Sequence, residues 1–229
     1  MKIEALLVDL DGTLLDTVGD FVAALTPLAA ELGAPAPSEA LVRRLIGRGG
    51  AQLLRDLLAH WGLTVQDFEA LRERYECHYR AVNGQRARLF EGVVVGLEGL
   101  RALGLRLACV TNKPQANAQA LLERFQLAAY FELLVGGAQG LRAKPAPDSL
   151  LQACAGLGLP PARCLMVGDS ANDAAAARAA GCAGVVLLRH GYNHGEPIEA
   201  VPAEAHLDGL DQLPAWLSDR AFLCPAAGS

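Results

Sequence analysis

The sequence has 229 residues, of which 52% are hydrophobic and 20% are charged, and its formal net charge at pH 7 is −5. This composition is typical of a globular protein, and because Lys and Arg form no long block we expect neither a nucleic acid nor an anionic membrane as partner. The six cysteines form no Cys-x-x-Cys pair and no apolar run approaches the roughly 18 residues of a membrane span, so we expect a cytoplasmic protein with reduced thiols.

The first predicted element is a buried strand at 5–8, which leads into the acidic stretch VDLDGTLLDT. Residues 17–82 then show four helical patterns and no strand, which is too long a stretch for an ordinary crossover loop. The first pattern opens with Thr17, and Asp20 follows three residues on, as in a capping box. We therefore expect 17–82 to form a helical cap inserted after the first strand.

From residue 83 onward, apolar runs alternate with helical patterns. The predicted strands are 105–110, 131–135, 164–168 and 184–188. The predicted helices are 93–103, 115–126, 147–157 and 171–180. Near-continuous apolar strands that alternate with helices predict a parallel sheet covered on both faces. The expected fold class is therefore α/β, with a Rossmann-like core formed by 1–16 and 83–229. The tail CPAAGS (224–229) is predicted to be disordered.

Polar side chains follow four of the predicted strands. In chain order they are Asp9 and Asp11, then Thr111 and Asn112, then Lys144, and finally Asp169 and Asp173. Each signal alone is equally well explained as a turn, a helix cap or a surface lysine. In open parallel sheets, however, ligands bind beyond the carboxyl ends of the strands. The four signals together therefore predict one site at this edge of the sheet.

The stretches that carry these residues are VDLDGTLLDT, VTNKP, KPAPDSLLQA and VGDSANDAAAARAAG. In this order they resemble the motifs of the haloacid dehalogenase-like hydrolase superfamily, in its phosphatase branch with a helical cap. The resemblance covers nearly the whole chain. Within the superfamily, TNKP and the late loop HGYNHGEPI most closely resemble the phosphoglycolate phosphatases.

The resemblance implies a Mg²⁺-dependent phosphatase that acts on a small phosphorylated metabolite through an aspartyl-phosphate. Asp9 would be the nucleophile, and Asp11 would protonate the leaving group and then activate water. A metal ion would offset the repulsion between carboxylate and phosphate, which is roughly 4 kcal/mol per pair of unit charges at 4 Å and an effective dielectric constant of 20. The other implied roles are metal binding by Asp9, the Asp11 backbone carbonyl, Asp169 and Asp173, and phosphoryl binding by Lys144, Thr111 and Asn112.

The expected substrate is 2-phosphoglycolate, and its recognition should come from the cap. Arg43 and Arg44, beside the glycine-rich GRGG (47–50), form the conspicuous cationic turn there; one of them could clamp a carboxylate, or both could lie on a solvated helix face. The alternatives are a phosphatase for another metabolite such as a sugar phosphate, a mutase resembling β-phosphoglucomutase, and a non-catalytic binding module with the same fold. The expected state is a monomer or a homodimer.

Overall fold

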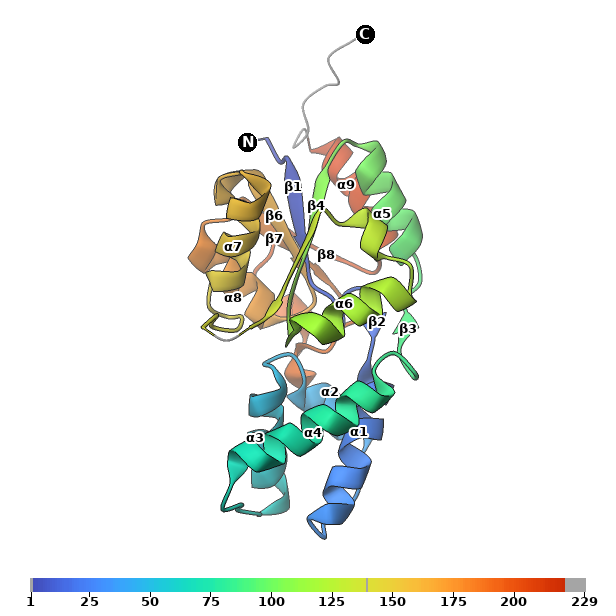
Figure 1. Ribbon diagram of the computed structural model, residues 1–229. Coiled ribbons are helices and arrows are strands. Elements are labelled where there is room, and N and C mark those ends of the chain that lie inside the picture. Colours follow the sequence, from blue (N-terminus) through green and yellow to red (C-terminus); the bar gives the residue numbers. More distant parts are fainter. Residues whose placement is uncertain (1, 139, 221–229) are drawn as a thin grey trace.

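The computed structural model describes residues 2–138 and 140–220, which form a core around a sheet and a separate helical cap (Figure 1). Within these residues the core sheet has six strands, all paired in parallel, in the order β5-β4-β1-β6-β7-β8. The strands are β1 (Ala5–Val8), β4 (Arg106–Pro114), β5 (Leu133–Gly137), β6 (Cys164–Gly168), β7 (Gly184–Leu188) and β8 (Ala205–Leu207). The predicted α/β fold class is confirmed.

Helices cover both faces of the sheet, as the apolar strands predict (Figure 1). They are α5 (Val93–Ala102), α6 (Gln115–Arg124), α7 (Asp148–Leu157), α8 (Ala171–Ala180) and α9 (Leu213–Asp219). Successive side chains of a strand point to opposite faces. Thus Leu6 and Val8 of β1 pack into the cluster with α5, α6 and α9, whereas Ala5 and Leu7 pack into the cluster with α7 and α8. Two apolar layers therefore fix the sheet whose carboxyl edge carries the polar residues.

Three strands of the core sheet differ from the prediction, and one of them is β4, which begins one residue later than predicted and runs on to Pro114, four residues past its predicted end. β5 begins two residues late because the backbone N–H of Phe131 still bonds to Ala128 in the preceding 3-10 turn, Ala128–Tyr130. The three-residue strand β8 was not predicted, since its sequence AHL is too short to give a pattern. The predicted disorder of 224–229 falls outside the described residues.

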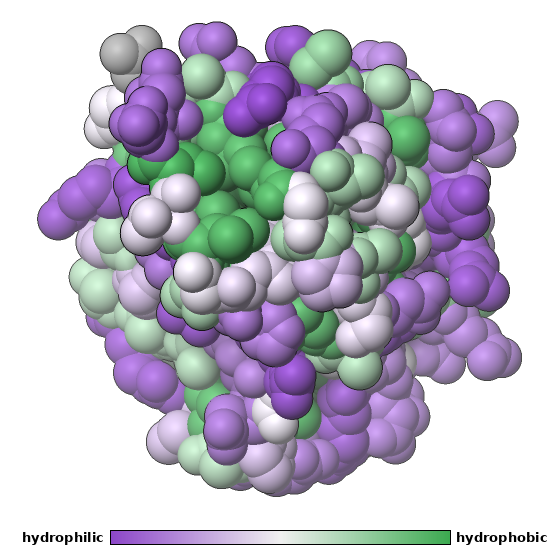
Figure 2. Space-filling view, turned by 90° about the horizontal axis from the view of Figure 1, so that it is seen from below, coloured by the Kyte–Doolittle hydropathy of each residue, from purple (hydrophilic) through white to green (hydrophobic). Residues whose placement is uncertain are grey.

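The cap has its own apolar core. Between residues 17 and 82, all of which the structure describes, lie four helices and no strand: α1 (Val18–Glu31), α2 (Glu39–Leu45), α3 (Gly50–Trp61) and α4 (Phe68–Val82). Their buried faces share one cluster, separate from the two clusters of the core. Seen from the cap side, the surface is mostly hydrophilic, with hydrophobic side chains gathered in one area (Figure 2). The cap is thus a separately packed helical unit that lies beyond the carboxyl ends of the strands (Figure 1).

Two short strands connect the cap to the core. β2 (Leu15–Asp16) leads into α1, and β3 (Arg88–Leu89) follows α4 after a short loop. They pair antiparallel, with Leu15 opposite Leu89. The chain therefore enters and leaves the cap side by side, at a single junction with the core (Figure 1).

The start of α1 corrects the predicted capping box. The fully buried Asp20 carboxylate accepts hydrogen bonds from the backbone N–H groups of Gly84 at 2.6 Å and Arg86 at 2.7 Å. Thr17, in turn, donates its hydroxyl to Asp11 at 2.6 Å instead of capping the helix. Asp20 is therefore a tie between the two connections of the cap, and the local pattern concealed it because its partners lie 64 and 66 residues away in the sequence.

Candidate active site

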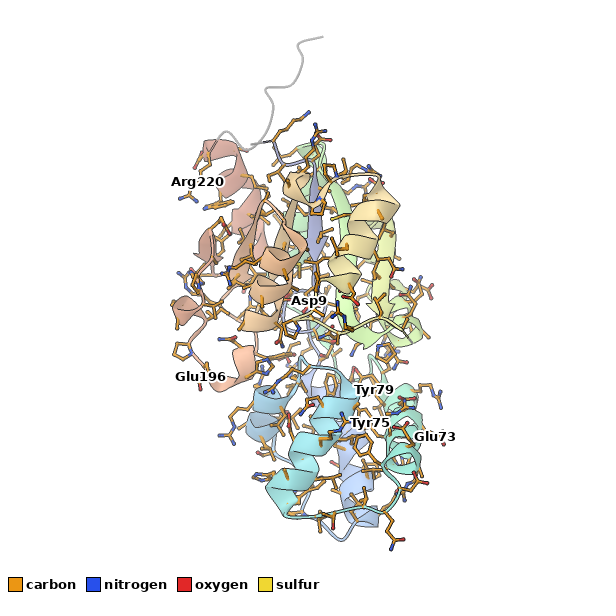
Figure 3. The ribbon with its side chains drawn as sticks, turned by 90° about the vertical axis from the view of Figure 1, so that its left-hand side faces the viewer. Asp9, Glu73, Tyr75, Tyr79, Glu196 and Arg220 are labelled. Carbon is orange, nitrogen blue, oxygen red and sulfur yellow. The ribbon has the colours of Figure 1, made fainter. Side chains whose placement is uncertain are left out.

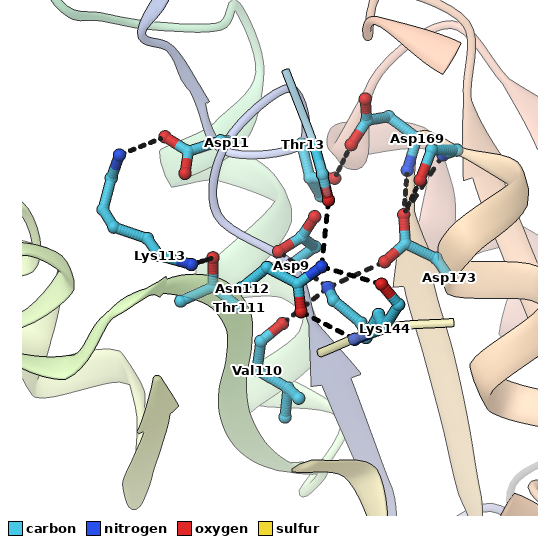
Figure 4. A network of polar contacts seen from close by, with 12 residues as sticks. Asp9, Asp11, Thr13, Val110, Thr111, Asn112, Lys113, Lys144, Asp169 and Asp173 are labelled. Carbon is cyan, nitrogen blue, oxygen red and sulfur yellow. Dashed lines mark hydrogen bonds and ion pairs between the residues drawn. The ribbon is translucent and has the colours of Figure 1, made fainter. Parts of the chain in front are cut away.

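Three buried carboxylates meet at the carboxyl edge of the sheet (Figure 4). Asp9 directly follows β1, Asp169 directly follows β6, and Asp173 lies in the first turn of α8. Each offers an oxygen, and these oxygens all lie within 4.8 Å of one another. β1 and β6 are neighbours in the sheet, so their ends bring together acids that are 160 positions apart in the sequence.

Asp169 is held by both the first and the last loops of the site. It accepts a hydrogen bond from the Thr13 hydroxyl at 2.9 Å and another from the backbone N–H of Tyr192 at 2.8 Å. Gly12 permits this approach, because its φ is +88° and a Cβ atom there would lie 2.3 Å from the carboxylate of Asp169. The Asp-Gly step of the sequence is thus both a turn and the place where the loop passes the acid.

Asp173 combines a structural and a site role. One of its oxygens accepts from the backbone N–H groups of Asp169 at 3.2 Å and Ser170 at 3.1 Å and from the Ser170 hydroxyl at 2.7 Å. Its other oxygen pairs with the ammonium of Lys144 at 2.7 Å. Asp173 therefore caps α8 and also pairs with Lys144, while its predicted role in metal binding stays a prediction.

Lys144 provides the positive charge of the cluster. Its ammonium lies 2.8 Å from Asp9, and it donates to the carbonyl of Val110 at 2.9 Å. Asn112 fixes the backbone of Lys144 from both sides: its side-chain carbonyl accepts from Lys144 N at 2.7 Å, and its amide donates to Lys144 O at 2.9 Å. The side chain of Asn112 thus holds the lysine loop, and the amide also reaches Gly47 of the cap at 2.9 Å.

The cluster carries more negative than positive charge. Burial raises the pKa of Asp9 to about 7 against the opposing effect of Lys144, and burial together with Asp173 and Asp9 raises the pKa of Asp169 well above its ordinary value. Burial would lower the pKa of Lys144, but the carboxylates beside it raise that pKa above its ordinary value. One lysine does not balance three buried acids. This excess charge and the all-oxygen donor set fit a hard divalent cation.

Asp11 faces a lysine that sequence reasoning missed. Lys113 is buried, and its ammonium lies 3.0 Å from Asp11, which also accepts the hydroxyl of Thr17. The same ammonium donates to the Tyr79 hydroxyl of α4 at 2.6 Å and lies 4.7 Å from the ring centre of Phe21 in α1. The motif TNKP contains this lysine. Two of the residues that it contacts, Tyr79 and Phe21, belong to the cap, so no spacing in the sequence could point to them.

A cavity of about 660 Å³ lies between core and cap. Of the predicted residues, Asp9, Asp11, Thr111 and Asn112 line it, while the other acids and Lys144 lie outside its lining. Its cap wall includes the aromatic side chains Phe21, Tyr75 and Tyr79, and its cationic side chains are Lys113, Arg72 and Arg142. Asp9 and Tyr79 lie on opposite sides of the boundary between core and cap (Figure 3).

The two predicted cap arginines do not belong to this wall. Arg43 pairs with Asp16 of β2 at 2.7 Å and lies 5.4 Å from the ring centre of Tyr192. The side-chain carbons of Arg44 lie against Gly195 of the late loop. Neither arginine is among the residues that line the cavity. Substrate binding by either one therefore stays a prediction, whereas a role at the junction of cap and core is visible.

Tyr192 links the acid cluster to the same junction. Its backbone N–H holds Asp169, while its hydroxyl accepts from the backbone N–H of Thr17 at 2.8 Å and donates to Asp16 at 2.9 Å. Its side chain packs into the apolar cluster of the cap. The late loop thus contacts an acid of the cluster, a connecting strand and the cap at once.

A family model for haloacid dehalogenase-like hydrolases matches residues 3–181 of the chain. The chain belongs to this family. The sequence motifs therefore identified the family correctly, and this haloacid dehalogenase-like hydrolase is an enzyme with its acids at the strand ends.

Curated relatives of this hydrolase match it along nearly its whole length. The plasmid-encoded phosphoglycolate phosphatase of Cupriavidus necator is 44% identical over 97% of this chain and 96% of its own. The phosphoglycolate phosphatase of Thiobacillus denitrificans is 39% identical over 92% and 93%. Among solved structures, a predicted phosphoglycolate phosphatase from Haemophilus somnus matches with a TM-score of 0.88 and 31% identity over 94% of this chain and 98% of that one. These relatives confirm the predicted resemblance.

Proposed function

We propose that this enzyme hydrolyses the phosphomonoester 2-phosphoglycolate to glycolate and phosphate, with Mg²⁺ as its cofactor. The observation that carries the proposal is the buried set of Asp9, Lys144, Asp169 and Asp173 beside a cavity that Asp9 and Asp11 line. The named relatives support the proposed substrate, since they are phosphoglycolate phosphatases and match this chain over almost their whole length.

The cation fits the donor set. Asp9, Asp169 and Asp173, together with the backbone carbonyl of Asp11, would hold it by oxygen atoms alone, as Mg²⁺ prefers. When bound, the ion supplies positive charge that offsets the repulsion between the Asp9 carboxylate and the phosphate dianion.

In the first half of the reaction, a carboxylate oxygen of Asp9 attacks phosphorus in line with the ester bond. A new oxygen–phosphorus bond forms on Asp9, the ester bond breaks, and the leaving glycolate oxygen takes a proton from Asp11. Lys144 restrains Asp9 during this step because its ammonium is fixed by Asp173 and the carbonyl of Val110.

In the second half, Asp11 takes a proton from a water molecule, and the water oxygen attacks phosphorus. The bond between Asp9 and phosphorus breaks, which releases inorganic phosphate and restores both carboxyl groups to their starting states. The Thr111 hydroxyl and the backbone N–H of Asn112 would donate hydrogen bonds to phosphoryl oxygens, and the position of both residues in the cavity lining supports this role.

Phosphate release from a panel of phosphomonoesters tests the proposal. With Mg²⁺, we expect 2-phosphoglycolate to give a higher kcat/KM than sugar phosphates, and we expect excess EDTA to abolish turnover until Mg²⁺ is restored. Preference for a sugar phosphate would favour the broader phosphatase. Interconversion of sugar phosphate isomers with little free phosphate would favour the mutase, and no turnover of any ester would favour the binding module.

A further inference from the structure

Lys113 is the cation of the cavity wall with a spare hydrogen-bond donor in a buried position. An ammonium has three N–H donors. Asp11 and the Tyr79 hydroxyl take two of them, at 3.0 and 2.6 Å, and no residue in the described ranges 2–138 and 140–220 accepts the third. The side chain is only 2% exposed, yet the residue lines the cavity. A buried, charged donor without an acceptor indicates a place for an anionic ligand group.

The hydroxyl of Tyr79 adds a second donor at the same point. Because its oxygen accepts from Lys113, its own proton is available to another acceptor, and none of the residues described by the structure provides one. Burial and the nearby carboxylates of Asp11 and Asp20 raise the pKa of Tyr79 well above its ordinary value, so the hydroxyl keeps this proton at neutral pH. Two adjacent donors, one of them charged, suit the two oxygens of a carboxylate.

The position of Lys113 relative to Asp11 selects where that carboxylate must lie in the substrate. In the proposed reaction Asp11 hydrogen-bonds to the ester oxygen, at roughly 2.7 Å. The ammonium of Lys113 is 3.0 Å from one carboxylate oxygen of Asp11, so whichever oxygen of Asp11 bonds to the ester, the ammonium is within about 8 Å of the ester oxygen. In 2-phosphoglycolate the carboxylate and the ester oxygen are bonded to the same carbon atom, so the acid group falls beside the ammonium.

Charge balance points the same way. Within the described residues the buried ammonium of Lys113 pairs with one carboxylate, Asp11, which also accepts the hydroxyl of Thr17. A carboxylate of the substrate adds a second negative charge beside the ammonium. A sugar phosphate, whose substituents there are hydroxyl groups, adds no such charge.

We infer that Lys113 and Tyr79 form the specificity site of this enzyme. They bind the carboxylate of a phosphorylated 2-hydroxy acid and so discriminate against phosphomonoesters that have no carboxylate. The inference rests on the proposed function and deepens it. Phe21 and Tyr79 hold the ammonium in position, with ring centres 4.7 and 4.6 Å away. The site therefore forms only when the cap, which carries both rings, is packed against the core.

The other cations near the cavity are less suited to this task. Arg72 is engaged by Glu69 and Glu76 on its own helix, and Arg142, with 74% of its side chain exposed, pairs with Asp148. Surface pairs of this kind contribute little, and their charge is screened by water. Lys113 is the cation that is both buried and in contact with the proposed general acid.

A pair of matched substrates tests the inference. We compare 2-phosphoglycolate with its amide, 2-(phosphonooxy)acetamide, which has the same shape without the negative charge. We expect Lys113→Met to lower the ratio of kcat/KM for acid over amide by about 10- to 100-fold, and Tyr79→Phe to lower it by about 3- to 10-fold. Lys113→Arg should restore part of the ratio, and Lys2→Met, which removes an exposed lysine, should leave it at the wild-type value.

Binding provides a readout that does not depend on turnover. In an Asp9→Asn background, calorimetric titration should give a lower Kd for 2-phosphoglycolate than for the amide, and Lys113→Met should remove that difference. If Lys113→Met weakens both ligands equally, or slows both substrates equally, Lys113 only positions Asp11 or the cap, and the inference is wrong. If Lys113→Met does not fold, the ratios of Lys113→Arg and Tyr79→Phe decide.

The result also separates this inference from the function on which it rests. If wild-type enzyme hydrolyses 2-phosphoglycolate but the variants keep the wild-type ratio of acid over amide, the inference falls and the proposed function stands. If wild-type enzyme hydrolyses neither compound, the proposed function falls and takes the inference with it.

Discussion

The two walls of the cavity are built on different principles. On the core side, Asp9 in the wall pairs with Lys144, and behind the wall Asp173 and Lys144 hold each other and the neighbouring backbone. On the cap side, the wall includes three aromatic side chains, and the hydroxyl of one of them, Tyr79, accepts a hydrogen bond from Lys113 of the core. A fixed set of charges suits chemistry that is common to all substrates, whereas a wall carried by a separately packed unit suits the choice among them.

The largest effect should come from Asp9, the proposed nucleophile on the core side. Asp9→Asn keeps the shape of the side chain but removes the attacking charge, so we expect phosphate release to fall by about 1,000-fold or more. The variant should remain folded, because Lys144 keeps its pair with Asp173. Phosphate release and thermal unfolding, measured on the same preparation, check both expectations. Activity within tenfold of the wild type would show that Asp9 is not the nucleophile.

The next largest effect should be on the free energy of unfolding, through the buried ion pairs of the core side. Lys144→Met leaves Asp9 and Asp173 buried without their cation, so we expect the free energy of unfolding to fall by about 3–5 kcal/mol in the absence of a metal ion. Adding Asp173→Asn should restore part of this loss, because it removes one of the unpaired charges. Urea unfolding of both variants measures the difference. A loss no greater than that of Lys2→Met, a change at an exposed lysine, would contradict the buried ion pairs.

A smaller effect is expected where the cap joins the core. Asp20→Asn weakens the two hydrogen bonds from the backbone of Gly84 and Arg86, and we expect the free energy of unfolding to fall by about 1–3 kcal/mol. Glu73→Gln, at an exposed acid of α4, is the matched control and should change little (Figure 3). Equal stability of the two variants would mean that Asp20 does not hold the cap connections.

The smallest effect should come from the half-exposed pair of Arg43 and Asp16. Although burial raises the pKa of Asp16, hydrogen bonds from Arg43 and Tyr192 hold it below its ordinary value of 3.8. The pair therefore stabilises the fold above pH 3.8, and its contribution is lost as the pH falls through the lower pKa of the folded state. We expect Arg43→Met to cost less than about 1 kcal/mol at pH 7 and less again at pH 3. Urea unfolding at both pH values checks the trend, and a cost that grows in acid would contradict it.

The same contrast explains what the sequence could and could not predict. Asp9, Asp169 and Asp173 follow strands whose apolar pattern is plain, and a parallel sheet must bring such strand ends to one edge. The depth of their burial and the fixed side chain of Asn112 were not predictable, because they depend on how the loops pack. The fold class, likewise, followed from the alternation of apolar runs with helical patterns.

On the cap side, local sequence patterns either predicted the wrong contacts or predicted none. Asp20 resembles a capping residue, but its carboxylate bonds to the chain that leaves the cap. Arg43 was one of the two conspicuous cations of the sequence, yet it pairs with the connecting strand, while Lys113 from the core donates a hydrogen bond to the hydroxyl of Tyr79. These contacts join segments of the cap and the core. The placement of the cap relative to the core depends on how their separate apolar clusters pack, and residue spacing in the sequence does not predict this placement.

Tyr192 gives this arrangement a mechanical consequence. A rotation of the cap about β2 and β3 has two ways to proceed: it breaks the bonds of the Tyr192 hydroxyl to Thr17 and Asp16, or it pulls the late loop along with it. In the second case the backbone N–H that steadies Asp169 shifts too. Opening the cap would then also loosen Asp169, a proposed ligand of the cation, so that cap opening and relaxation of the proposed metal site would be coupled.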